Sequence, residues 1–193
     1  SGDYKKAISF YKKGLDINPL YLNILVNLSL SLKEIKDFDS AISVCYKAID
    51  INKNYPEIYF NLAKIQQAKG DINASDEAYR LAIKFRPSYV EAYYNLALLN
   101  TEKGEFLLAI KLYKKAIILR PKYYEAIWNL SLVELLIGDY KSGWDNYKYR
   151  WRRDNPPILH GNYNVKEWDN EDIFKAEKLL VIAEQGYGDT LQY

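Results

Sequence analysis

Cysteine, histidine and long apolar runs are nearly absent from this 193-residue sequence. The single cysteine, Cys45, excludes an internal disulfide and favours a reducing compartment, so we expect a cytoplasmic protein. One cysteine and one histidine, His160, argue against a metal site. No apolar run of about 18 residues occurs, so no membrane span is expected. The net charge of +2 is near balance and no long basic run occurs, which gives no reason to expect a nucleic-acid partner.

What the sequence does contain is one pattern that recurs every 34 residues. Four complete units span residues 22–55, 56–89, 90–123 and 124–157, and residues 1–21 form the end of an earlier unit. The fifteenth place of the unit holds Gly2, Lys36, Gly70, Gly104 and Gly138, and the sixteenth holds Asp3, Asp37, Asp71, Glu105 and Asp139. A glycine can take a positive φ angle and end one helix, and the acid after it can cap the next. Lys36 should carry backbone strain if it takes the same angle.

Other columns of the repeat predict a stack of helix pairs. The twentieth place is small in each unit, as in Ala41 and Ala109, which lets two helices approach closely. Proline near the end of most units stops the second helix, and apolar residues between these marks recur at helical spacing. A single pair of helices cannot close a core, so each pair stacks on its neighbour. The sequence therefore predicts an all-α solenoid.

These columns resemble the tetratricopeptide repeat family over residues 1–154. The resemblance implies a right-handed superhelical solenoid whose first helices line a concave groove, and a role in protein binding rather than catalysis. The chain begins in the middle of a unit, so we expect it to be a piece of a longer protein.

Three columns of the first helices share a face that the core does not fully occupy. They hold the sixth-place asparagines, the fifth-place rings and the second-place acids. The residues are Asn27, Asn61, Asn95 and Asn129; Phe60, Tyr94 and Trp128; and Glu57, Glu91 and Glu125. By family geometry this face lines the groove.

Two interpretations of the asparagines stay open. An amide has one acceptor and two donors, so a row of four could hold an extended polypeptide with little regard to its sequence. The O-linked N-acetylglucosamine transferase family is similar in using repeat asparagines in this way. The rings would add apolar contact, and the glutamates would favour a partner with lysine or arginine. Alternatively, each amide bonds a neighbouring helix and has a structural role.

The last unit departs from the pattern. Arg150 replaces the glycine or alanine of the other units, and Tyr140, Trp144, Tyr147 and Trp151 recur at helical spacing. We expect these four rings to share one face, either as a capping helix or as a docking surface for a following domain. Exposed aromatic faces also make self-association an alternative function.

Beyond the repeats, residues 155–173 have the composition of an extended connector, and residues 174–193 predict the start of an α/β domain. Leu179 to Ala183 form an apolar run typical of a buried strand, and a glycine turn follows. Helix-start amides after such a turn can hold phosphate, which makes Gly186 and Gly188 candidate phosphate-binding residues.

Residues 138–153, the connector and this strand together resemble bacterial proteins in which such repeats precede a glycosyltransferase-like domain of the two-lobed heptosyltransferase type (GT-B). The resemblance implies a nucleotide-sugar cofactor for the longer protein and a general-base role for Asp189, which could instead only cap a helix. Since neither lobe is complete, we expect no transferase activity and no cofactor in this chain.

The leading hypothesis is thus a scaffold that binds a protein or peptide in the repeat groove and presents it to a glycosyltransferase-like domain. The alternatives are a repeat arm whose protein acts mainly in sugar transfer, and a self-association module.

Overall fold

The computed structural model describes residues 2–154, and all the elements in this part of the chain are helical. Their bounds are α1 (Gly2–Ile17), α2 (Leu22–Glu34), α3 (Phe38–Ile51), α4 (Pro56–Lys69), α5 (Ile72–Phe85), α6 (Val90–Glu102), α7 (Phe106–Leu119), α8 (Tyr124–Leu136), α9 (Tyr140–Tyr147) and the 3-10 helix η1 (Lys148–Arg152). The even-numbered α-helices are the first helices of the units, and the odd-numbered ones are the second helices. The described residues thus confirm the predicted all-α solenoid.

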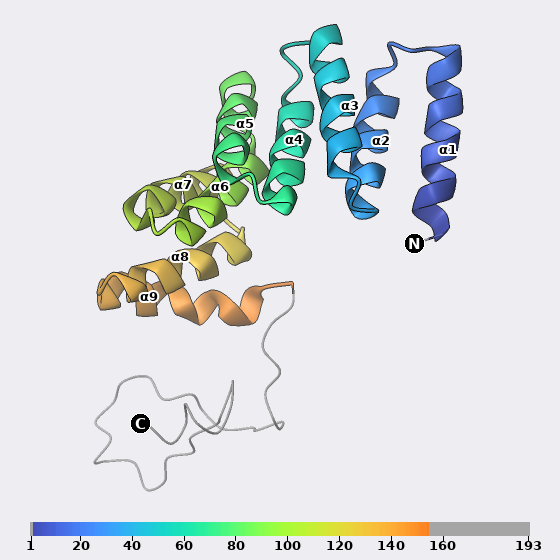
Figure 1. Cartoon of the computed structure of the whole chain (residues 1–193). Helices are drawn as coiled ribbons and strands as arrows, with labels where there is room; N and C mark the ends of the chain where they lie inside the picture. Colours follow the sequence, from blue (N-terminus) through green and yellow to red (C-terminus); the bar gives the residue numbers. More distant parts are fainter. Residues whose placement is uncertain (1, 155–193) are drawn as a thin grey trace, which may run out of the picture.

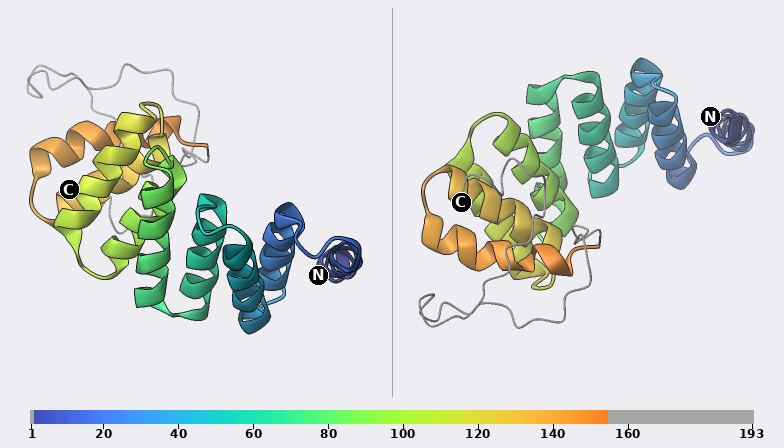
Figure 2. Two further views of the ribbon diagram at one scale, coloured as in Figure 1. Left: turned by 90° about the horizontal axis from the view of Figure 1, so that it is seen from above. Right: turned by 90° about the horizontal axis from the view of Figure 1, so that it is seen from below.

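Successive helices run antiparallel and follow a curved path, with α1 at one end of the repeat region and α9 at the other (Figure 1). The views from above and below show the same order of helix pairs along the curve (Figure 2). Each helix packs mainly against the helices that precede and follow it in the sequence, as expected for a structure in which units contact only their neighbours.

The glycine column ends the first helices as predicted. Gly70, Gly104 and Gly138 have φ angles of 96°, 77° and 87°. Lys36 takes the same left-handed conformation, with φ of 63°, and is the only non-glycine residue with positive φ in the described part of the chain. The connection therefore keeps its geometry even where the favourable residue is missing.

The acid column caps the second helices only in part. Asp37 accepts a hydrogen bond from the backbone N–H of Ser40 (3.3 Å), and Asp139 accepts one from Ser142 (3.2 Å). Asp71 and Glu105 stand at the same place without a side-chain cap bond, so the prediction is wrong for them. The Asp71 carboxylate instead lies 3.7 Å from Lys69 Nζ.

Close packing of paired helices explains the small column. Ala41, Ser75 and Ala109 are fully buried, and a Cβ atom on Gly143 would lie 2.7 Å from side-chain atoms of Leu135. Ser75 also donates a hydrogen bond from Oγ to the carbonyl oxygen of Ala63 (2.9 Å). Small residues here let the two helices of a unit meet along their backbones.

The last unit differs from the prediction in one respect. Helix α9 ends at Tyr147, and the chain continues as η1, so Trp151 does not extend the helical face of Tyr140 and Trp144. Those two rings are 65% and 61% exposed. Arg150 stands on η1, where its side chain lies over the rings of Tyr147 and Trp151.

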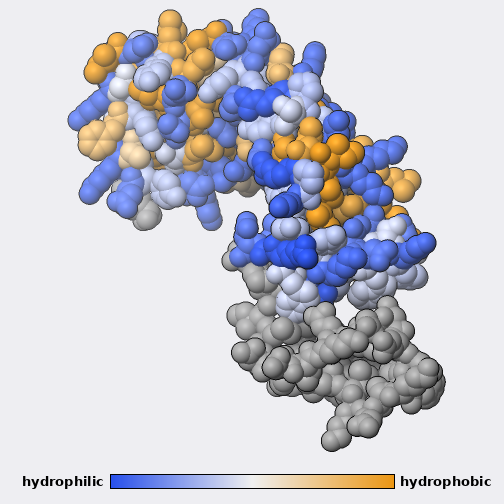
Figure 3. Space-filling model, turned by 180° about the vertical axis from the view of Figure 1, so that it is seen from behind, coloured by the Kyte–Doolittle hydropathy of each residue, from blue (hydrophilic) through white to orange (hydrophobic). Residues whose placement is uncertain are grey.

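Exposed apolar residues are spread over several helices of the described part. Seen from behind, apolar patches alternate with hydrophilic residues (Figure 3). No helix among residues 2–154 is long and apolar enough to cross a membrane.

Candidate peptide-binding face

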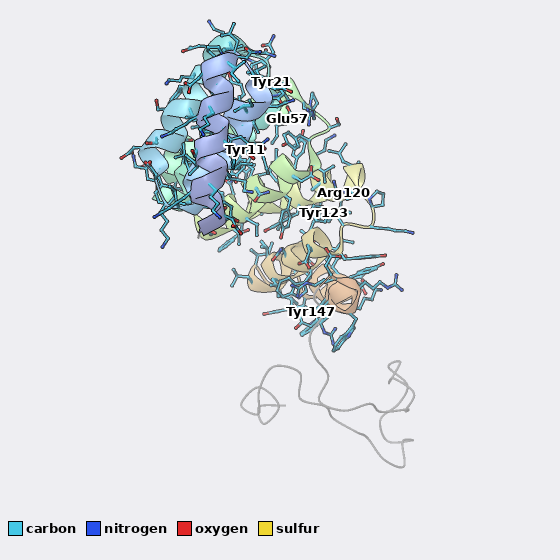
Figure 4. The ribbon with its side chains drawn as sticks, turned by 90° about the vertical axis from the view of Figure 1, so that its right-hand side faces the viewer. Tyr11, Tyr21, Glu57, Arg120, Tyr123 and Tyr147 are labelled. Carbon is cyan, nitrogen blue, oxygen red and sulfur yellow. The ribbon has the colours of Figure 1, made fainter. Side chains whose placement is uncertain are left out.

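The candidate site is the surface of the first helices α2, α4, α6 and α8 that carries the asparagine, ring and glutamate columns. We call it the first-helix face. In a side view Tyr21, Glu57, Arg120 and Tyr123 follow one edge of the repeat region from its amino-terminal end towards α8 (Figure 4). The columns of the third and fourth units meet directly, since Asn129 of α8 bonds Tyr94 of α6.

The four asparagines have four different environments. Asn27 is exposed, and Asn95 and Asn129 are half-buried. Asn61 is only 7% exposed, because α4 packs closely against α2. The expectation that all four asparagines line an open groove is therefore wrong for Asn61.

Neighbouring residues decide what each amide bonds. Asn129 Nδ2 donates to the hydroxyl oxygen of Tyr94 (2.9 Å), which stands at the fifth place of the preceding unit. The equivalent neighbour of Asn95 is Phe60, which has no hydroxyl, and Asn95 Nδ2 donates instead to the carbonyl oxygen of Glu91 in its own helix (2.7 Å). The structural interpretation of the column thus holds for Asn129, and the carbonyl oxygens of both amides keep acceptor capacity.

The ring column is ordered by a second set of rings that the sequence analysis missed. Phe60 lies 5.0 Å from Tyr89, and Tyr94 lies 4.9 Å from Tyr123, as measured between ring centroids. Tyr89 and Tyr123 occupy the last place of the unit, and the signal that could have found them is the column Tyr21, Tyr55, Tyr89 and Tyr123 at 34-residue spacing. Burial raises the pKa of both Tyr89 and Tyr123 to about 12, and Glu57 adds to the shift of Tyr89.

Each glutamate of the column is already paired with an arginine of its own unit. Arg86 Nη2 donates to Glu57, and Arg120 Nη2 donates to Glu91. In the last unit Arg153 Nε donates to Glu125 at 3.0 Å. Burial raises the pKa of Glu91, but the hydrogen bond and charge of Arg120 outweigh it, so the pKa lies below its usual value. The charges of these acids are compensated within the chain, which removes the reason to expect a basic partner at this column.

The same arginines cover aromatic rings. The guanidinium carbons of Arg86 and Arg120 lie 4.8 Å and 4.9 Å from the ring centroids of Tyr89 and Tyr123. Arg153 lies 3.7 Å from the centroid of Trp128. The face thus presents partly exposed guanidinium groups fixed on rings, an arrangement that gains from cation–π attraction.

The other predicted site residues lie elsewhere. Asp189, Gly186 and Gly188, the connector and the predicted α/β start lie outside the described residues. Within residues 2–154 no group of three or more histidine, cysteine or acidic side chains is placed to hold a metal ion. Cys45 is fully buried, at the place that Tyr79 and Tyr113 hold in the next two units.

Two family models match this sequence. One, described as the tetratricopeptide repeat, matches residues 1–19, 22–55 and 90–123, and the other, described as the TPR repeat, matches residues 67–104. This repeat region belongs to the tetratricopeptide repeat family. Two of the matched segments coincide with the units 22–55 and 90–123. A comparison with curated protein sequences gives no significant match.

Solved structures share the fold. The crystal structure of MamA is 27% identical, has a TM-score of 0.70, and the match covers 77% of this chain and 86% of that chain. MamA from Desulfovibrio magneticus RS-1, residues 41 to the end, is 16% identical with a TM-score of 0.69, over 80% and 89% of the two chains. YrrB, titled a TPR protein with an unusual peptide-binding site, is 14% identical with a TM-score of 0.66, over 75% and 74%.

Proposed function

We propose that the repeat region is a protein-interaction scaffold that binds a polypeptide along the first-helix face. The observation that carries this proposal is that Asn27 and Asn95 keep hydrogen-bonding capacity on a face whose Phe60 and Tyr94 rings are already ordered by neighbouring tyrosines. Asn27 makes no side-chain hydrogen bond within the described residues, and Asn95 keeps a free carbonyl oxygen. YrrB supports the proposal to the extent that a protein of similar fold has a peptide-binding site.

The face is preorganised for binding. Tyr94 is fixed by contacts with Tyr113, Tyr123 and Asn129, so its ring loses little conformational freedom when a partner contacts it. A rigid aromatic group beside polar amides gives apolar contact and backbone hydrogen bonds to an extended chain. The paired glutamates do not select the partner by charge, because their arginines neutralise them.

The proposal predicts which amides matter for binding. Peptides selected from a phage-displayed random library against the full chain should lose affinity roughly tenfold on Asn27→Ala plus Asn95→Ala, since each change removes one hydrogen bond to the peptide. Fluorescence anisotropy with labelled selected peptides measures the affinity. Asn73→Ala on the exposed side of α5 is the matched control and should leave it unchanged. Failure to select any peptide, or equal affinity for the double variant, would overturn the proposal.

A wider role rests on the resemblance of residues 155–193 to the start of a glycosyltransferase-like domain. In this role the repeats are the arm that recruits a polypeptide substrate to such a domain. Asp189 would act as the general base, and Gly186 and Gly188 would lie near the phosphates of the nucleotide sugar. A longer protein that includes the following domain should turn over a nucleotide sugar, and Asp189→Ala should abolish that turnover without altering peptide binding. Absence of nucleotide-sugar binding by that protein would contradict this role.

Self-association is the second candidate function, and the exposed rings of Tyr140 and Trp144 favour it. A contact through these rings should make the mass measured by sedimentation depend on concentration, and Trp144→Lys should remove that dependence. A monomer at all concentrations would reject it.

A further inference from the structure

The first unit lacks the arginine that occupies the first-helix face in the units after it. In the second and third units the arginine at the thirty-first place, Arg86 or Arg120, lies over the tyrosine at the last place and bonds the glutamate at the second place. The first unit has Asn52 and Asn23 at the arginine and glutamate places, while Tyr55 keeps the tyrosine place. Neutral asparagines thus replace both members of the ion pair, while the tyrosine ring over which the arginine would lie remains.

The structure has a hollow where that arginine would lie. It has a volume of about 360 Å3 and is lined by Leu20, Tyr21, Leu22, Asn23, Asn52 and Tyr55. The two tyrosines of this lining belong to the same column as Tyr89 and Tyr123. Burial is the main cause that raises the pKa of Tyr55. Glu57 of the next unit raises this pKa further and Arg86 lowers it, so both charged groups lie near the Tyr55 ring. The chain itself therefore places an arginine, Arg86, between two successive tyrosines of this column, Tyr55 and Tyr89.

We propose that this hollow binds an arginine side chain of a partner polypeptide. Arg86 and Arg120 show how a guanidinium is held at the equivalent place, with its carbon 4.8–4.9 Å from the centroid of the tyrosine ring and a hydrogen bond to the second-place glutamate. A planar, delocalised cation suits such a ring platform better than the compact ammonium of lysine. The exposed side chain of Leu20 adds an apolar surface for the methylene groups of the arginine.

The polar groups of the hollow can accept hydrogen bonds from this guest. Asn23 Oδ1 accepts one bond, from the Tyr55 hydroxyl at 3.4 Å, and Asn52 Oδ1 accepts one from the backbone N–H of Asn54 at 3.0 Å. A carbonyl oxygen has two lone pairs, so each keeps one for a guanidinium N–H. Because both acceptors are neutral, a single arginine should bind weakly, and its contribution adds to that of the peptide backbone.

This inference deepens the proposed function and rests on it for the nature of the occupant. The two can still fail separately. A selected peptide that binds through Asn27 and Asn95 but shows no preference for arginine would refute only the hollow. An arginine derivative that occupies the hollow while no peptide binds would refute only the scaffold.

The test is a nuclear magnetic resonance titration of the full, 15N-labelled chain with N-acetyl-arginine amide. N-acetyl-lysine amide tests whether a compact cation can replace the planar guanidinium. N-acetyl-citrulline amide tests whether the positive charge is needed, because citrulline is planar but neutral. The arginine probe should shift the backbone amides around Tyr21 and Tyr55 and leave those around Tyr89 unchanged, since Arg86 already fills that place. Equal shifts at both places, or equal effects of citrulline, would overturn the proposal.

Two variants sharpen the test. Asn52→Arg supplies the internal arginine and should abolish binding of the probe, whereas Asp50→Asn, which changes the charge by the same amount two residues earlier, should not. Asn23→Glu restores the acid of the other units and should raise the affinity roughly two- to fivefold, as expected for an exposed ion pair. Unchanged affinity in Asn52→Arg, with helix content unchanged by circular dichroism, would refute the site.

Discussion

Replacing Lys36 by glycine should stabilise the protein. Lys36 has φ of 63°, and the equivalent residues of the next three units are glycines with φ between 77° and 96°. A lysine in this conformation places its Cβ close to its own carbonyl oxygen, whereas glycine has no Cβ. The side chain of Lys36 is exposed and forms no ion pair within the described residues, so little is lost with it.

The size of the effect follows from two opposing terms. A left-handed conformation costs a non-glycine residue about 1–2 kcal/mol. Glycine loses more chain entropy on folding than lysine does, and this loss offsets about 0.5–1 kcal/mol of the gain from relieved strain. The net stabilisation should be about 0.5–1 kcal/mol, which corresponds to a rise in melting temperature of about 1–4 °C for a chain of this size.

Urea unfolding followed by circular dichroism measures the free energy of unfolding and its midpoint. Gly104→Lys is the reverse control. A Cβ atom at Gly104 would meet nothing within 4 Å, so that change carries only the backbone cost and should destabilise by a similar amount. An unchanged or lower midpoint for Lys36→Gly, while Gly104→Lys lowers it, would refute the reasoning that backbone strain at this place is relieved by glycine.

Three further predictions concern packing and charge. Gly143→Ala should destabilise more than Gly14→Ala in urea unfolding, because the new Cβ meets the Leu135 side chain and backbone at 2.7–3.0 Å, whereas at Gly14 it meets only the end of one flexible side chain. Cys45, whose pKa burial raises to about 12, should react with iodoacetamide at pH 8 only after unfolding; reaction at the rate of a free thiol in the folded protein would contradict this. Burial raises the pKa of Asp76, but its arginine, lysine and asparagine partners outweigh it and lower the pKa. The ionised Asp76 carboxylate therefore stabilises the fold at pH values above its unfolded pKa of about 4. This stability is lost as the pH falls through the lower pKa of the folded state. Urea unfolding at several acidic pH values should show a smaller decline in stability for Asp76→Asn than for the unchanged protein.

The solenoid could be predicted from sequence because its determinants are local and repeated. Glycine at a helix end, a small residue at a close helix contact and apolar residues at helical spacing each act within one unit. The left-handed conformation of Lys36 shows that the repeated frame fixes the backbone even where one unit lacks the favoured residue. The register of all four units therefore follows from a few columns.

Partners of side chains on the first-helix face could not be predicted in the same way. The Glu57 column appeared as a row of free charges, because its arginine partners stand about 30 places later in each unit and reach it only once the second helix returns to the start of the first. Pairing between places so far apart depends on the path of the loop. The early end of α9 escaped prediction for a related reason, since Trp151 keeps the helical spacing in sequence while the backbone beyond Tyr147 tightens into η1.

The asparagine column shows how one repeated residue can acquire different roles. Its neighbour at the fifth place of the preceding unit is valine, phenylalanine and tyrosine for Asn61, Asn95 and Asn129 in turn, and only the last offers a hydroxyl. Asn129 is thereby drawn into the contact between units, while Asn95 turns to its own helix and Asn27 stays open. Under the proposed function, Asn27 is the amide most open to a partner, and it lies in the unit 22–55, whose Leu22, Asn23, Asn52 and Tyr55 line the hollow. Constant spacing builds the solenoid, and the residues that vary within it decide which amides of the first-helix face keep free hydrogen-bonding groups.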